Sequence, residues 1–66
     1  MQLQVNGKAH QLTSGSSLQD LLTELGFTEG RIAVEVNRDI VPRSQHPDHV
    51  LQEGDRVEIV HAIGGG

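Results

Sequence analysis

Apolar and polar residues alternate at the start of the chain. In the segment MQLQVN, Met1, Leu3 and Val5 are apolar and the residues between them are polar. This period of two is typical of a strand that buries one face. The next two residues, Asn6 and Gly7, suit a tight type I′ turn, because both central positions of that turn need a positive φ. The pattern predicts a strand followed at once by a hairpin turn.

The return strand of this hairpin is expected over about residues 8–12. Two registers are compatible with the sequence. A two-residue turn pairs Val5 with Lys8 and Leu3 with His10, whereas a bulged turn moves the side chains to the other face. The register therefore stays open at this stage.

The segment SGSSLQDLLTELG has the clearest helical pattern in the chain. Ser17 can cap the first turn, Asp20 stands three residues later in a capping-box arrangement, and Gly26 can take the left-handed conformation that ends a helix. Leucines recur at the spacing of one helix face: Leu18, Leu21, Leu22 and Leu25. This face is expected to be core, with Glu24 on the solvated side.

A second alternating segment, RIAVEVNRDIVPR, predicts a strand that directs Ile32, Val34 and Val36 inward. A turn is expected over residues 37–39 and a short strand over residues 40–41. Because Pro42 cannot donate a hydrogen bond to a neighbouring strand, this short strand ends there or lies at the edge of a sheet.

The last predicted strand is RVEIVHAI, which the loop QEGD positions. The alternation places Val57 and Ile59 on the core side, and Glu58 and Val60 on the other face. Two strands, a helix and further strands in 66 residues predict one α+β domain, with the helix across one face of a sheet.

A valine that faces solvent is a candidate contact residue. Val60 has this position, and Ala33 and Glu35 of the neighbouring strand are expected to face outward as well. Together with Glu58 they could form a shallow docking surface beside the end of the chain. A lone exposed valine with no function is an equally good interpretation of the pattern.

Composition limits the possible chemistry. The chain has nine acidic and five basic residues, a net charge of −4, one Phe, and no Tyr, Trp or Cys. The net charge disfavours nucleic acids and anionic membranes as partners, and it favours a partner with a basic dock. The absence of cysteine excludes disulfides, zinc thiolate sites and thiol nucleophiles. Neither a signal segment nor a span of membrane length is visible, so a cytoplasmic protein, monomeric when free, is expected.

The histidines give no clear site. His46 and His49 form an H-x-x-H pair, but Pro47 lies between them and a third ligand is not obvious, so a surface loop is expected and no metal is predicted. His10 and His61 look isolated in the sequence.

The chain ends in AIGGG, and this segment either has a chemical function or is an end without one. A run of glycines can thread a narrow channel that excludes any Cβ atom, and it would deliver the carboxylate of Gly66 to a site inside another protein. A carboxylate is a poor electrophile, so it would need activation, most simply by attack on the α-phosphate of ATP. The alternative is an unstructured end without a function.

The order, length and terminal glycines of the chain resemble the ubiquitin-like β-grasp family, and within it the ThiS family of bacterial thiamin-pathway sulfur carriers. The segments that carry the resemblance are MQLQVNGK, SLQDLLTELG, IAVEVNRDIVPR, LQEGDRVEIV and AIGGG. The resemblance implies a β-grasp domain over residues 1–62, with a mixed sheet of four to five strands, the first and last strands parallel at its centre, and one main helix across it. It also implies a flexible tail over residues 63–66.

The function implied by the resemblance is sulfur delivery. A ThiF-like adenylating enzyme would use ATP and magnesium to adenylate Gly66, sulfur originating from cysteine would convert it to a thiocarboxylate, and a ThiG-like thiazole synthase would take the sulfur. The tail residues Ile63, Gly64, Gly65 and Gly66 would thread into the partners' active sites. The carrier would bind no cofactor and would supply no catalytic residue of its own. A molybdopterin carrier, a protein-conjugation modifier and a tail-independent interaction domain are the alternatives.

Overall fold

The computed structural model describes residues 1–28 and 31–61. Its elements, in chain order, are β1 (Gln2–Val5), β2 (Lys8–Gln11), α1 (Leu18–Leu25), β3 (Ile32–Val36), β4 (Asp39–Ile40), the 3₁₀ turn η1 (Arg43–Gln45) and β5 (Arg56–His61). The described strands form one five-stranded sheet in the order β2-β1-β5-β3-β4. The predicted α+β class is confirmed.

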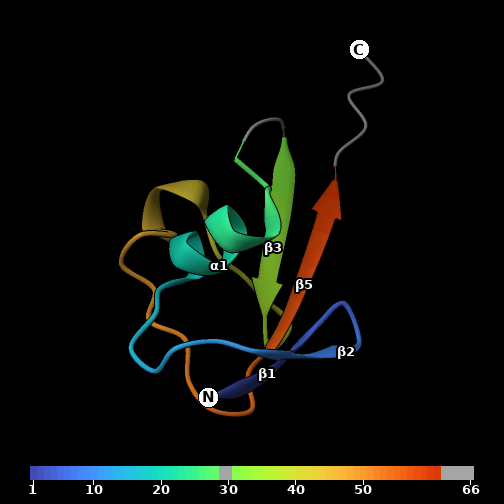
Figure 1. Cartoon of the computed structure of the whole chain (residues 1–66). Helices are drawn as coiled ribbons and strands as arrows, with labels where there is room; N and C mark the ends of the chain where they lie inside the picture. Colours follow the sequence, from blue (N-terminus) through green and yellow to red (C-terminus); the bar gives the residue numbers. More distant parts are fainter. Residues whose placement is uncertain (29–30, 62–66) are drawn as a thin grey trace.

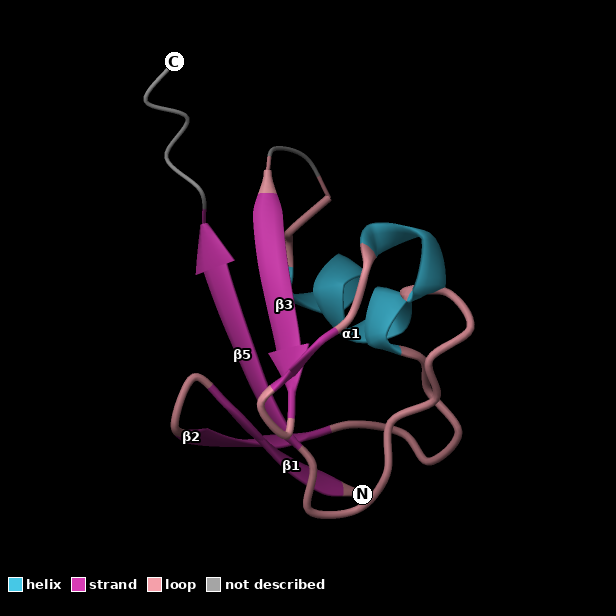
Figure 2. Ribbon diagram, turned by 180° about the vertical axis from the view of Figure 1, so that it is seen from behind, coloured by secondary structure: helices cyan, strands magenta, loops and turns pink. Residues whose placement is uncertain are grey.

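The sheet is mixed, and the first and last strands of the chain lie side by side within it. β1 and β5 are parallel, and the other three pairings are antiparallel. The helix α1 lies on one side of the sheet (Figures 1 and 2). The expected central pairing of the first and last strands is therefore confirmed.

The first hairpin has the two-residue register. Val5 is opposite Lys8 and Leu3 is opposite His10. Asn6 and Gly7 have φ values of 50° and 81°, the positive values that a type I′ turn needs. The sequence left this register open, and the turn geometry decides it.

The helix begins and ends at the predicted residues. The Ser17 hydroxyl accepts a hydrogen bond from the Asp20 N–H at 3.1 Å, and the Asp20 carboxylate accepts one from the Ser17 N–H at 2.9 Å. Gly26 ends the helix with φ 87°, in the left-handed region. Leu18, Leu21 and Leu22 are buried. The capping box, the stop and the core face are confirmed.

The second hairpin also turns within two residues. Asn37 and Arg38 have φ values of 52° and 72°, and Val36 is opposite Asp39. β4 ends at Ile40, so Val41, which was expected within the strand, lies just after it as a buried core residue. β4 is one of the two edge strands of the sheet, and it ends two residues before Pro42. Both expectations for this proline are met.

The core lies between the helix and the sheet. Its buried apolar residues come from every layer of the fold: Leu3, Leu12, Leu18, Leu21, Leu22, Val34, Val36, Val41, Leu51, Val57 and Ile59. Met1, Val5, Leu25, Phe27 and Ile32 pack against this cluster and are partly exposed. The core is aliphatic, as the composition requires.

Two expectations about histidines are wrong. His46 is buried, with 2% of its surface exposed, and its Nε2 lies 3.0 Å from the carbonyl oxygen of Val41. The backbone C=O of His46 also accepts a hydrogen bond from Gln19 N–H, so this segment closes over the helix instead of forming a free surface loop. The sequence alone did not show this, because the contacts join residues brought together by the fold.

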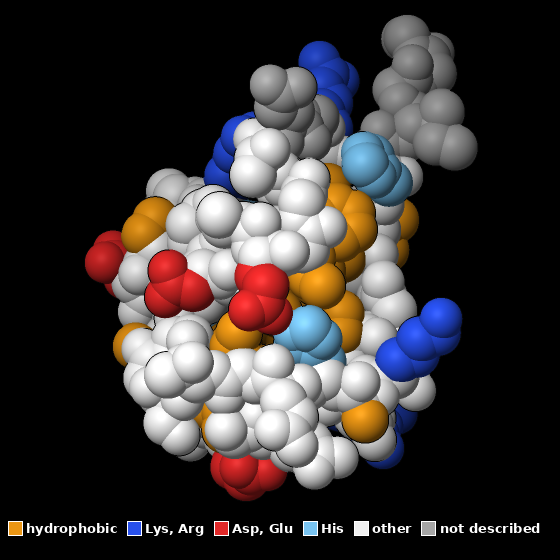
Figure 3. All heavy atoms as spheres, viewed as in Figure 1, with side chains coloured by type: hydrophobic (Ala, Val, Ile, Leu, Met, Phe, Trp, Pro, Cys, Tyr) orange, Lys and Arg blue, Asp and Glu red, His pale blue; other side chains and the backbone are white. Residues whose placement is uncertain are grey.

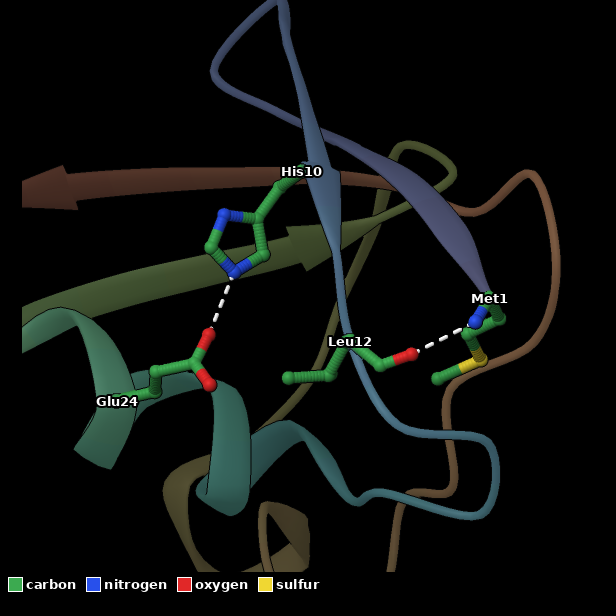
Figure 4. Close-up of polar contacts among 4 residues, drawn as sticks. All are labelled: Met1, His10, Leu12 and Glu24. Atoms are coloured by element: carbon green, nitrogen blue, oxygen red, sulfur yellow. Dashed lines mark hydrogen bonds and ion pairs between the residues drawn. The ribbon is translucent and has the colours of Figure 1, made fainter.

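His10 is not isolated. Its Nε2 lies 2.7 Å from a carboxylate oxygen of Glu24, which links β2 to α1 (Figure 4). Glu24 was expected to be simply solvated. The amino group of Met1 donates to the Leu12 carbonyl at 2.7 Å in the same region and ties the start of the chain to the end of the hairpin. The first contact holds the hairpin against the helix, and the second closes the open end of the hairpin.

Candidate functional site

The four residues of the predicted docking surface lie together in the sheet. In the antiparallel register of β3 and β5, Ala33 is opposite Val60 and Glu35 is opposite Glu58. Directly opposed side chains of an antiparallel pair have Cβ atoms about 4.5–5.5 Å apart. The two strands therefore place the four side chains in one compact group.

This group lies on the face of the sheet opposite the core. Val34, Val57 and Ile59 are buried, whereas Val60, which follows Ile59, is 56% exposed. Ala33 and Glu58 are exposed and Glu35 is partly exposed. The alternation in the sequence predicted which side each residue faces, and the structure agrees.

The sequence did not reveal a fifth residue on this face. Ile40 of β4 is opposite Glu35 and is 73% exposed, more than Val50 and Val60, the other large hydrophobic residues exposed within residues 1–28 and 31–61. A two-residue turn at Asn37 and Arg38 would have predicted this position, because it places Ile40 opposite Glu35. We call Ala33, Glu35, Ile40, Glu58 and Val60 the open-face patch.

The open-face patch has an acidic centre with apolar ends. Glu35 and Glu58 are opposite each other, and neither carboxylate takes part in a salt bridge within the described part of the chain. Like charges directly opposite each other destabilise a sheet. A basic group from a partner would remove this repulsion, so the patch is complementary to a surface that presents a cation between apolar side chains.

Replacing Glu58 with Gln tests this interpretation. We expect Glu58→Gln to raise the free energy of unfolding by about 0.2–1 kcal/mol, because it removes the cross-strand repulsion. The same change should weaken docking to a partner with a basic surface. Urea denaturation measures the first effect and titration calorimetry measures the second. A variant that is more stable and also binds more tightly would contradict the assignment.

The tail residues Ile63, Gly64, Gly65 and Gly66 lie outside the described residues, so their predicted threading stays a prediction. The last described residue of β5 is His61. Its ring packs against Phe27 with the ring centroids 5.8 Å apart, and Phe27 follows the end of α1. The end of β5 is therefore held against the helical side of the domain, while Val60 faces the opposite side.

The helical side has a shallow groove of its own. Its lining includes Val5, Leu25 and Phe27 together with Lys8 and His10. Figure 3 shows hydrophobic side chains reaching the surface in a strip on this side of the molecule, with acidic side chains to one side and a basic side chain to the other. The groove is lined by the basic side chains of Lys8 and His10, whereas the open-face patch contains the carboxylates of Glu35 and Glu58.

Other kinds of site find little support in the described part. Within residues 1–28 and 31–61 no group of three His, Asp or Glu side chains is placed to hold a metal ion. None of the helices described in the structure is long and apolar enough to cross a membrane.

Comparison with known proteins decides the family. The family model described as the ThiS family matches residues 3–66, which include the terminal glycines. The chain belongs to the ThiS family. A solved ThiS structure, the thiamine biosynthesis protein from Geobacter metallireducens, superposes with a TM-score of 0.86 at 29% identity and covers all of both chains. The predicted ubiquitin-like β-grasp fold is thereby confirmed.

Curated relatives fall into two groups. The sulfur carrier protein ThiS of Escherichia coli is 35% identical over 66 residues, which is the whole of both chains. The thiazole synthases of Magnetococcus marinus and Paramagnetospirillum magneticum are 44% and 39% identical over the same 66 residues. This chain spans only 20% of the length of each of those two proteins, so they contain a ThiS-like region within a much longer chain.

Proposed function

We propose that this chain is a sulfur carrier for thiazole formation in thiamin biosynthesis, and that the carboxylate of Gly66 carries the sulfur. The observation that carries the proposal is the match to the ThiS family through residue 66, together with full-length similarity to proteins named as ThiS sulfur carriers. The proposed carrier is a protein co-substrate, monomeric when free and located in the cytoplasm.

The chemistry follows from the limits of a carboxylate. A Gly66 carboxylate oxygen attacks the α-phosphate of ATP, and pyrophosphate leaves. The acyl-adenylate then has a good leaving group, so a hydrosulfide ion whose sulfur originates from cysteine attacks its carbonyl carbon, AMP departs and the S–H proton is lost to solvent. The product is a thiocarboxylate. The ATP, the magnesium ion and the catalytic groups belong to the adenylating enzyme.

The absence of cysteine agrees with this chemistry. A carrier that holds sulfur on its backbone end needs no thiol, and this chain has none. The three terminal glycines have no side chain, which suits entry into a narrow active site. In this proposal the tail reacts and the folded domain provides recognition.

Recognition is assigned to the open-face patch. Val60 is six residues before Gly66, and an extended chain spans at most about 3.3–3.6 Å per residue, so the reactive end can reach roughly 20 Å beyond this residue. A partner that docks on the patch can therefore hold the carrier while the tail enters an active site at that distance. The adenylating enzyme and thiazole synthase are the proposed partners.

The thiazole synthase relatives support the second partner. Two proteins with that name contain a region similar to the whole of this chain. A carrier and an enzyme that act in succession benefit from covalent linkage, because linkage raises their effective concentration.

Intact mass spectrometry tests the proposal directly. The protein is incubated with the ThiF-like enzyme, magnesium ATP and a cysteine-fed sulfur donor. A gain equal to the exchange of one oxygen for one sulfur is the expected result. No mass change and no adenylate would favour an interaction domain that does not use its tail, whereas an adenylate that never gains sulfur would favour protein conjugation or a different donor.

A further inference from the structure

Both hairpin turns send an asparagine side chain to β5. Asn6 Oδ1 accepts a hydrogen bond from the Ile59 N–H at 2.7 Å. Asn37 Oδ1 accepts one from the Arg56 N–H at 3.0 Å. Each asparagine is the first central residue of its turn and has a positive φ. The two side chains therefore contact the same strand, one near its beginning and one in its outer half.

Asn6 extends the ladder between β1 and β5 beyond the end of β1. The backbone pairing of these strands ends with Val5 opposite Val57, and the Asn6 N–H donates to the Val57 carbonyl at 2.8 Å. The chain then turns away into β2, so β1 has no further carbonyl to offer. The Asn6 carboxamide oxygen occupies that place and accepts from Ile59.

The position of this hydrogen bond is important for the end of the domain. Beyond Val57, β5 pairs only with β3 among the described strands. In both ribbon views the turn of the first hairpin lies beside β5 (Figures 1 and 2). Ile59 stands directly before Val60, and β5 ends two residues later at His61. The Asn6 contact therefore holds the outer half of β5 from the side that lacks a strand.

We propose that Asn6 is a positioning residue for sulfur transfer, which rests on the function proposed above. Its carboxamide fixes the direction in which β5 leaves the sheet, and so fixes Val60 of the open-face patch relative to the start of the tail. Without it the part-buried Ile59 N–H loses its partner, and the outer half of β5 keeps only its pairing with β3 and the contact of the His61 ring with Phe27. A partner then meets a less ordered docking surface.

The contribution of the turn can be separated from that of the side chain. Glycine adopts a positive φ without steric cost, so Asn6→Gly keeps the turn and removes the carboxamide. Aspartate tolerates the left-handed region and retains an acceptor oxygen, so Asn6→Asp should restore the contact. Asn37→Gly is the control, because it removes the equivalent contact from the beginning of β5, together with the hydrogen bond that Asn37 Nδ2 donates to the Asp55 carboxylate.

Amide hydrogen exchange and activation kinetics test the proposal together. We expect Asn6→Gly to speed exchange at the Ile59 amide about fivefold or more, because the substitution removes the hydrogen bond that this amide donates. Asn37→Gly should leave exchange at the Ile59 amide unchanged. In an ATP–pyrophosphate exchange assay with the adenylating enzyme, Asn6→Gly should raise KM for the carrier several-fold with little change in kcat. Asn6→Asp should return KM to near the wild-type value.

Two results would overturn the assignment. One is unchanged exchange at Ile59 in Asn6→Gly. The other is an equal rise of KM in Asn6→Gly and Asn37→Gly, which would indicate general destabilisation. If the unmodified carrier is not activated at all, the proposed function fails, and hydrogen exchange at Ile59 still decides whether Asn6 holds β5.

Discussion

A carrier that lacks Gly65 and Gly66 is expected to fold normally and to support no thiazole formation. The buried core residues all lie between Leu3 and Ile59, so removing the last two glycines takes nothing from the core. The deletion removes the carboxylate from its reactive position and shortens the tail by about 7 Å. Circular dichroism melting should show an unchanged transition, while reconstituted thiazole synthesis should fall to background.

A second variant separates tail length from tail chemistry. A semisynthetic chain with a carboxamide at Gly66 keeps the full tail but cannot attack ATP as a carboxylate does. It should bind the adenylating enzyme as the unmodified chain does, give no adenylate and act as a competitive inhibitor. Thiazole formation by the truncated chain would refute the role of Gly66.

Replacing Val60 with Asp is expected to cause the second large loss, at the docking step. The open-face patch already contains two carboxylates, Glu35 and Glu58, next to this valine. A third negative charge removes an apolar contact and forces the partner to desolvate an additional charge. Loss of an important interface contact typically costs about 1–3 kcal/mol, which corresponds to a rise in Kd of about fivefold to 150-fold. Titration calorimetry with the adenylating enzyme measures it.

The chain offers a matched control for this substitution. Val50 is 54% exposed, against 56% for Val60, and lies outside the open-face patch, in a segment that forms an isolated bridge with Ser17 near the start of the helix. Val50→Asp therefore makes the same change in size and charge as Val60→Asp, at a position of nearly equal exposure. It should leave Kd unchanged. Equal losses from the two variants would mean that added negative charge, and not the patch, weakens binding.

Tail deletion and Val60→Asp should also differ in kind. The deletion leaves the patch intact, so the truncated carrier should still bind and compete with the unmodified one. Val60→Asp leaves the tail intact, so a sufficiently high carrier concentration should restore the rate. KM should therefore rise in Val60→Asp, whereas kcat should vanish in the deletion.

Much of the fold could be predicted because its signals are local. The capping box at Ser17 and Asp20, the left-handed Gly26 and the alternation around Val57 each depend on residues a few positions apart. Their physical causes, helix capping and the two-residue period of a strand, act within one element. The facing of Ala33, Glu35, Glu58 and Val60 followed from the same period.

Other features depended on which elements become neighbours. Ile40 joined the open-face patch only when the second turn was known to span two residues, because a shift of one residue would send it to the opposite face. His46 and His10 were misjudged for a related reason. Their partners, the Val41 carbonyl and the Glu24 carboxylate, reach them through a loop closure and through packing of the helix on the sheet.

The sequence by itself determined the helix, the strands and the side that each strand residue faces. Only the tertiary structure decided the registers, the acidic pair of Glu35 and Glu58, and the reach of Asn6 to Ile59. The physical reason is the range of the interactions. Backbone propensity and periodicity are set within a few residues, whereas a contact between residues 53 positions apart exists only after the sheet has assembled.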